Sequence, residues 1–354
     1  MAKTPFSLTD TSEQSEIGPY DGQTSDPPWF LAQDDGDTLA DIPLPRVNRR
    51  ALIDPSDWGA AQSELAADLA SVAMLFGALD ERLRTAPPGW RHRLALLEAT
   101  ELSWWVGDRI AVDRLALWDT LRLAGAQDDS QELGRAGWAL RRLSGGPDLS
   151  ASSPSLAEFL GRHMGADTTA DGVEDLADLL RSADHLHPIT QSAIVFHGWR
   201  MLGQGGAATE IEATVLAARL ASLMGRVHPQ GRGAVFMPIA LAGFAAHKGG
   251  PVIDRLSAWL RGAERATLAA LLHLGRLADW QGRATTALAD LQGRTPAHLI
   301  AAIAEWPMVS APMAETITKS SRATVQRNLA LMQTRGLIRE VTGQGRYRVW
   351  TAKI

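Results

Sequence analysis

The last sixty residues, 295–354, carry the pattern that most constrains how this chain can fold. Ser321 is placed to cap a helix, because a serine hydroxyl can accept a hydrogen bond from the backbone N–H groups of a first turn. Apolar residues then recur at steps of four and three residues, so one helix face is expected to be buried. That face comprises Val325, Leu329 and Met332. Gly336 would end the helix in the left-handed conformation.

Two short strand-like runs follow between residues 337 and 350, on either side of a Gly-x-Gly turn at 342–345. Two further helices are predicted before the capped helix, over 296–305 and 311–318, the second capped by Ser310. Helices in this order, closed by a small β-ribbon, predict a winged helix-turn-helix over residues 295–354.

The charge of this segment differs from that of the rest of the chain. Residues 295–354 have a net charge of +5, whereas the whole chain has a net charge of −5, so the remainder has −10. A local basic patch favours contact with phosphate. We therefore expect binding to double-stranded DNA, with the capped helix (321–335) in the major groove and the wing (342–348) beside it. The residues expected to contact DNA are Lys319, Ser321, Arg322, Thr324, Gln326, Arg327, Arg346 and Arg348.

Residues 55–294 are expected to form a multi-helical body, which makes the predicted fold mainly α. Apolar residues recur there at helical spacing between short turns rich in Gly, Pro and Asp. The predicted helices cover about 55–86, 90–106, 112–123, 132–143, 173–183, 190–202, 210–224, 235–246 and 252–259, with one or two more over 261–291. Residues 167–172 are predicted to be a loop, and a sub-boundary is expected near 145–155. Residues 1–54 lack any sustained period and are predicted to be a disordered or loosely packed arm.

Composition narrows the chemistry that is available to the body. There is no cysteine, which excludes disulfides, thiolate metal sites and a cysteine nucleophile. There is neither a signal-like leader nor a long apolar run, so we expect a cytoplasmic protein without a membrane partner. His185 and His187 lack companions at metal-ligand spacing, and Glu98 and Glu101 fit a solvated helix flank. We therefore expect no catalytic, metal or cofactor site.

One segment resembles a catalytic signature. His228-Pro229 followed by Gln-Gly-Arg-Gly233 is similar to the motif with which Fic enzymes transfer nucleotidyl groups. The aromatic, acidic and Asn positions of that motif are absent here, so neither a Mg²⁺ ligand nor a proper phosphate cradle is expected.

Three stretches also resemble a bacterial family in which a helical domain of unknown function is joined to a C-terminal helix-turn-helix DNA-binding domain. They are Ala78-Leu-Asp-Glu-Arg-Leu-Arg-Thr-Ala-Pro87, Leu186-His-Pro188 with Trp199, and Thr342-Gly-Gln-Gly-Arg-Tyr-Arg-Val-Trp350. The similarity runs from about Trp58 to the end, and the family's early helices resemble the amino-terminal part of Fic proteins. The resemblance implies a helical fold with a DNA-binding tail and supplies no substrate.

Together these observations predict a transcriptional regulator that is not an enzyme. The helical body would serve dimerisation, giving a homodimer, or would sense a small-molecule effector. One alternative is a degenerate Fic-like protein whose body binds a nucleotide or a protein partner without catalysis. Another is an interaction scaffold that binds neither DNA nor nucleotide.

Overall fold

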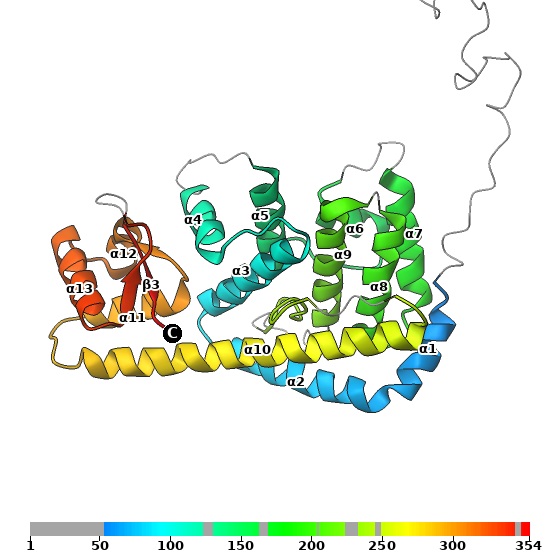
Figure 1. The fold of residues 1–354 in the computed structure, drawn as a ribbon, viewed down its shortest axis with the longest axis horizontal. Coiled ribbons are helices and arrows are strands. Elements are labelled where there is room, and N and C mark those ends of the chain that lie inside the picture. Colours follow the sequence, from blue (N-terminus) through cyan, green and yellow to red (C-terminus); the bar gives the residue numbers. More distant parts are fainter. Residues whose placement is uncertain are drawn as a thin grey trace, which may run out of the picture. The chain divides into compact units, whose positions relative to one another are not determined.

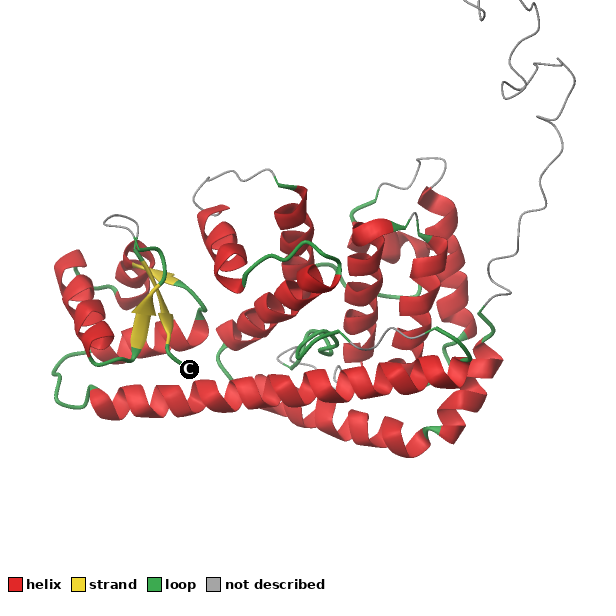
Figure 2. Ribbon diagram, in the orientation of Figure 1, coloured by secondary structure: helices red, strands yellow, loops and turns green. Residues whose placement is uncertain are grey.

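The computed structural model describes residues 53–122, 130–162, 169–203, 205–223, 233–244, 249–343 and 348–354. The predicted arm therefore lies outside the described residues, except for its last two positions. Thirteen helices and three short strands form within the described ranges, which confirms the predicted mainly α fold (Figure 1). All the strands belong to the C-terminal region (Figure 2). Every helix in the described ranges is too short or too polar to span a lipid bilayer.

Ten helices make up the described part of the body. They are α1 (Pro55–Glu64), α2 (Ala66–Thr85), α3 (Pro88–Trp105), α4 (Val112–Arg122), α5 (Gln131–Ser144), α6 (Ser153–Leu160), α7 (Thr169–Ser182), α8 (Pro188–Leu202), α9 (Gly206–Ala221) and α10 (Val252–Ala287). The C-terminal elements are α11 (Thr295–Glu305), β1 (Val309–Ser310), α12 (Ala311–Thr318), α13 (Arg322–Thr334), β2 (Ile338–Glu340) and β3 (Val349–Ala352).

The first predicted helix is divided in two. Asp54 caps α1 as expected, because its side chain accepts a hydrogen bond of 2.9 Å from the Ser56 N–H. The helical conformation is then interrupted at Leu65, whose φ and ψ are −96° and 22°. The change of direction lets Trp58 of α1 and Phe76 of α2 both reach the core, where both are fully buried.

Helix α10 is a single element of 36 residues, so the predicted break near residue 260 is wrong. Its interior has no proline, and the apolar face continues without interruption from Leu256 to Ala284. At 1.5 Å per residue the helix is about 54 Å long. It packs against α1, α2 and α8 of the body and against α11 of the C-terminal region (Figure 1). One rigid element thus joins the two regions.

Another difference is that the described part of the predicted helix over 235–246, residues 235–244, is not helical. Residues 233–244 are an irregular segment that is buried over 236–241. Four of its backbone N–H groups are bound by two carboxylates: Asp80 of α2 accepts from Ala234, and Glu98 of α3 accepts from residues 239–241. Buried N–H groups must find acceptors, and here the acceptors come from distant side chains in place of an i−4 carbonyl.

The expectation that Glu98 lies on a solvated helix flank is therefore wrong. Its side chain is fully buried, and it accepts from the N–H groups of Ile239 and Ala240 at 2.7 Å each and of Leu241 at 3.0 Å. Burial raises the pKa of Glu98 to about 7, although the three N–H donors act in the opposite direction.

The predicted loop over 167–172 is also partly wrong, because α7 already begins at Thr169. The residue types there, Thr-Ala-Asp, suit the first turn of a helix as well as they suit a loop.

Candidate nucleic-acid interface

The described residues of the C-terminal region, 295–343 and 348–354, form three helices and a three-stranded antiparallel sheet. The strand order is β1-β3-β2, with Val309 opposite Trp350 and Ile338 opposite Ala352. Helix α13 packs its apolar face inward, and Val325, Leu329 and Met332 are each fully buried, as the spacing predicted. The region is a helix-turn-helix (α12, α13) followed by a small β-ribbon.

The turn between α12 and α13 is set by a left-handed residue and a cap. Lys319 has φ 52° and ψ 39°, which ends α12 and turns the chain. Ser321 then caps α13: its hydroxyl accepts from the Thr324 N–H at 3.4 Å and lies 3.0 Å from the Thr324 hydroxyl. Ser310 caps α12 in the same way by accepting from the Met313 N–H at 3.3 Å.

The outer face of α13 is polar and basic. Arg322, Gln326 and Arg327 are exposed on it, and Lys319 and Ser321 are exposed in the turn before it. Thr324 is half-buried, and its hydroxyl is already engaged with Ser321. Thus five of the eight predicted contact residues are exposed on α13 or in the turn before it, and Thr324 is half-buried on the same helix.

Arg322 is largely accessible to solvent. Its side chain is 72% exposed and lies 3.8 Å from Glu315 of α12, at the limit of an ion pair. Among the described residues, Arg327 and Lys319 have no acidic partner within ion-pair distance. These cations can therefore meet phosphate without first breaking a strong ion pair.

The wing begins at β2, where Glu340 binds its own turn. The Glu340 carboxylate accepts from the N–H groups of Thr342 and Gly343 and from the Thr342 hydroxyl. The Thr342 hydroxyl, more than the other donors, lowers the pKa of Glu340. Arg346 lies outside the described residues, so its role stays a prediction. Sequence reasoning missed Glu340, although an acidic residue two positions before a Thr-Gly turn is a local signal for such a cap.

Arg348, the other basic residue predicted on the wing, immediately precedes β3 and is exposed. Its guanidinium carbon lies 5.3 Å from the centre of the Trp350 ring, and one nitrogen lies 3.5 Å from Gln333 Oε1. The Trp350 indole N–H also donates to Gln333 Oε1, at 3.2 Å. Gln333, which the sequence did not single out, therefore links the end of α13 to the wing.

Two of the basic residues that were counted in the charge of this region face the body instead. Arg335 forms a two-pronged pair with Asp290, at 2.6 and 2.7 Å, and Arg339 lies 3.5 Å from Asp113 of α4. The hydrogen-bonded pair raises the pKa of Arg335 and lowers that of Asp290. The net charge of +5 therefore overstates the charge that is available to a nucleic acid.

The region is also bonded to the body through buried groups. The Trp280 indole of α10 donates to the Leu337 carbonyl at 2.7 Å. Arg93 of α3 donates to the carbonyls of Ile303 and Trp306 at 2.6 and 2.8 Å. At Gly89 a Cβ would come within 2.5 Å of the Glu305 carbonyl, so the start of α3 approaches the end of α11 too closely for a side chain.

Comparison with known proteins agrees with this geometry. Residues 297–352 match a protein family described as an HTH DNA binding domain. The match begins inside α11 and ends with β3, so it covers the whole unit described above. The C-terminal region is a helix-turn-helix DNA-binding domain. No curated protein shows significant sequence similarity to the chain.

The body's histidine and carboxylate candidates have structural contacts. His187 caps α8, because its Nδ1 accepts from the Ile189 N–H at 3.2 Å, while His185 is exposed. Within the described ranges no group of three or more His, Asp or Glu residues is arranged to hold a metal ion. His228 and Arg232 of the Fic-like segment lie outside the described residues, so that alternative stays a prediction.

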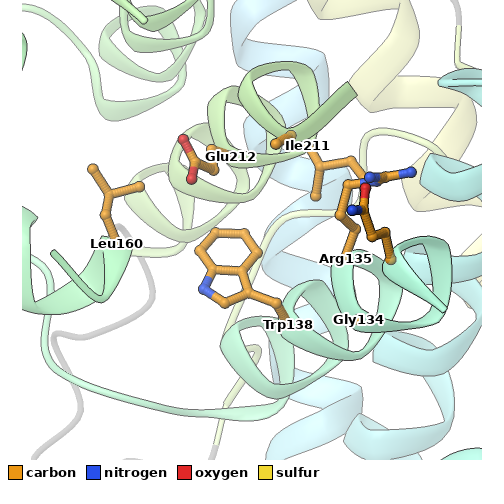
Figure 3. A pocket seen from close by; sticks show the side chains of 8 residues that line it. Gly134, Arg135, Trp138, Leu160, Ile211 and Glu212 are labelled. Atoms are coloured by element: carbon orange, nitrogen blue, oxygen red, sulfur yellow. The ribbon is translucent and has the colours of Figure 1, made fainter. Parts of the chain in front are cut away.

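A pocket of about 400 Å³ lies between α5, the end of α6 and α9 (Figure 3). Trp138 and Ile211 line it, and its charged members are Arg135 and Glu212. Both are engaged in internal bonds: Arg135 pairs with Asp108 at 2.7 Å, and Glu212 accepts from the Trp199 indole and from Arg162. The polar groups of this pocket thus serve the packing of the body.

Proposed function

We propose that this protein is a sequence-specific, DNA-binding transcriptional regulator. Residues 295–354 would be the DNA-reading domain and residues 55–294 the regulatory body, with residues 1–54 as an arm. The observation that carries the proposal is the surface of α13. Its basic and amide side chains face outward on a helix whose opposite face is anchored in the core of a helix-turn-helix domain.

In this proposal α13 enters the major groove of double-stranded DNA through its first two turns. Arg322, Gln326 and Arg327 would reach base edges, because guanidinium and amide groups make paired hydrogen bonds to guanine and adenine. Thr324 would contribute at the edge of this surface. Ser321 would hold the start of the helix and present its N–H groups to a phosphate.

Phosphate contacts would come from Lys319 in the turn and from Arg346 and Arg348 on the wing. Lys319 precedes α13 and Arg348 lies near Gln333 towards its end, so phosphate contacts at the two ends would fix the orientation of the helix in the groove without reading sequence. A homodimer would bind two such half-sites one helical turn apart.

The test is selection of fragmented genomic DNA by the full-length protein, followed by titration of the recovered sequence at several salt concentrations. A common motif, with log affinity falling linearly as log salt rises, is the expected result. A motif with two-fold symmetry would support the homodimer. No enrichment at low salt would overturn the proposed function.

A further inference from the structure

A cavity of about 290 Å³ lies where α3, α4 and α10 meet the DNA-binding domain. One part of its lining is apolar and comes from Leu96, Leu97, Val112 and Met308. The other part is cationic, with Arg93 on the body side and Arg339 and Lys353 on the side of the DNA-binding domain. The cavity is therefore built from both regions of the chain.

Arg93 is a buried cation with no counter-ion among the residues that the structure describes. It is 3% exposed, and the two acceptors of its guanidinium, the carbonyls of Ile303 and Trp306, are neutral groups. Within the described residues it has no carboxylate within ion-pair distance, and its Nε has no hydrogen-bond partner. Buried charges in proteins are normally paired, because burial without a counter-ion is costly. Burial lowers the pKa of Arg93 to about 10, so it remains a cation at neutral pH.

His273 of α10 adds a second unused polar group to the same lining. Its Nε2 is buried and has no partner among the described residues. Burial, together with Arg93 and Arg276, lowers the pKa of His273 to about 4, so the imidazole is neutral at pH 7. A neutral imidazole can donate one hydrogen bond to an anion. Asp113 also lines the cavity, but it already lies 3.5 Å from Arg339.

We propose that this cavity binds a small carboxylate with an apolar body, with Arg93 as its counter-ion and Leu96, Leu97 and Met308 against its carbon skeleton. A carboxylate matches a single buried guanidinium in charge, and an apolar lining suits a hydrocarbon body. A phosphate would carry more charge and need more donors than the buried part of the cavity offers.

The position of Arg93 also indicates how such a ligand would act. Ile303 and Trp306, whose carbonyls it holds, lie at the end of α11, the first helix of the DNA-binding domain. An anion that draws the guanidinium toward the cavity would compete with these two bonds. Ligand binding and the seating of the DNA-binding domain are then coupled, and the effect on DNA affinity rests on the proposed function.

The test uses benzoate as the probe and benzamide as its neutral match, titrated calorimetrically into the full-length protein at constant ionic strength. Saturable binding of benzoate, and not of benzamide, is expected. Arg93→Gln should weaken it about tenfold or more, since a hydrogen bond to a charged group is lost. Val112→Phe, which fills the cavity and keeps Arg93, should abolish it. Arg82→Gln, at an exposed position of α2, is the control and should bind as the wild type does.

Absence of saturable benzoate binding would overturn the proposal, and so would equal binding of benzamide. Unchanged binding in a folded Val112→Phe variant would also overturn it, whether or not Arg93→Gln folds. DNA affinity is then measured with and without benzoate. Benzoate binding in a protein that binds no DNA would refute the proposed function and leave the cavity assignment standing. DNA binding without benzoate binding would refute the cavity assignment and leave the proposed function standing.

Discussion

The indole Nε1 of Trp280 donates a buried hydrogen bond of 2.7 Å to the backbone carbonyl of Leu337. Trp280 lies in the last third of α10, and Leu337 lies between the end of α13 and the start of strand β2. The Leu337 carbonyl also accepts from the Lys353 N–H at 3.0 Å. The long helix of the body thus contacts the chain at the point where α13 ends and the wing begins.

Replacing Trp280 with Phe should therefore destabilise the protein. The change removes a buried hydrogen bond and part of a packed ring, which we expect to cost about 1–3 kcal/mol. The measurement is urea unfolding followed by circular dichroism. Leu272→Ala, on the exposed side of the same helix, is the control and should have little effect. Equal stability of the Trp280→Phe variant and the wild type would show that this contact does not hold the domain.

The irregular segment 233–244 requires glycine at its start. A Cβ at Gly233 would lie 2.0 Å from Asp80 Oδ1, the atom that accepts from the Ala234 N–H. Gly233→Ala should cost about 1–3 kcal/mol, because the carboxylate must move and release the segment. Gly249→Ala is the matched control, since a Cβ there meets nothing within 4 Å. Thermal unfolding of both variants checks this, and similar melting temperatures would contradict it.

Glu98 should make stability depend on pH. Its pKa in the folded protein is about 7, above the ordinary value of 4.5, so the folded state binds more protons between these values. The contribution of Glu98 to the free energy of unfolding is thus complete below pH 4.5 and is lost as pH rises toward 7. The slope from this group is at most about 1.4 kcal/mol per pH unit.

The comparison that isolates Glu98 is the wild type against Glu98→Gln, because His273 acts with the opposite sign. The pKa of His273 falls from 6.5 to about 4 on folding, so its contribution is lost as pH falls. We expect the unfolding free energy of the wild type minus that of Glu98→Gln to decrease from pH 4.5 to pH 7, because only the wild type loses stability through this group. A difference that grows with pH would mean that the three N–H donors, and not burial, control the carboxyl group.

Arg335 should behave differently from Arg322 and Arg327 in DNA binding. Arg335 is held by Asp290, whereas the other two face outward from α13. Arg335→Ala should leave the salt dependence of DNA affinity unchanged, although the domain loses a link to the end of α10. Fluorescence anisotropy at several salt concentrations measures this, and a shallower slope would place Arg335 among the phosphate contacts.

Local patterns predicted the C-terminal domain well. The caps at Ser310 and Ser321, the buried face of α13 and the left-handed Gly336 all depend on neighbours within one helical turn. The body was harder to predict where distant residues decide the structure. Residues 235–246 have helical composition, yet the N–H groups of residues 239–241 are taken by Glu98, more than 140 positions away.

Contacts between residues distant in sequence also limited what could be predicted about the candidate site. Charge counting could not show that Arg335 and Arg339 face Asp290 and Asp113, because those acidic residues are far away in sequence. Nor could it identify Arg93 as a buried cation, since its place on α3 resembles that of any helix-flank arginine. Spacing within a helix indicates which side is buried, but only the packing of helices indicates what lies against that side.

The most direct test of the account is the salt dependence of DNA affinity for the wild type and for Arg322→Ala/Arg327→Ala, measured on a selected genomic sequence. We expect the double variant to lose about 1–3 kcal/mol of binding free energy for each base contact removed. Where an arginine instead meets phosphate, the slope of log affinity against log salt should become shallower by about 0.9. Arg82→Ala, on the exposed surface of α2, should match the wild type. Unchanged affinity and slope in a folded double variant would contradict the claim that α13 reads DNA.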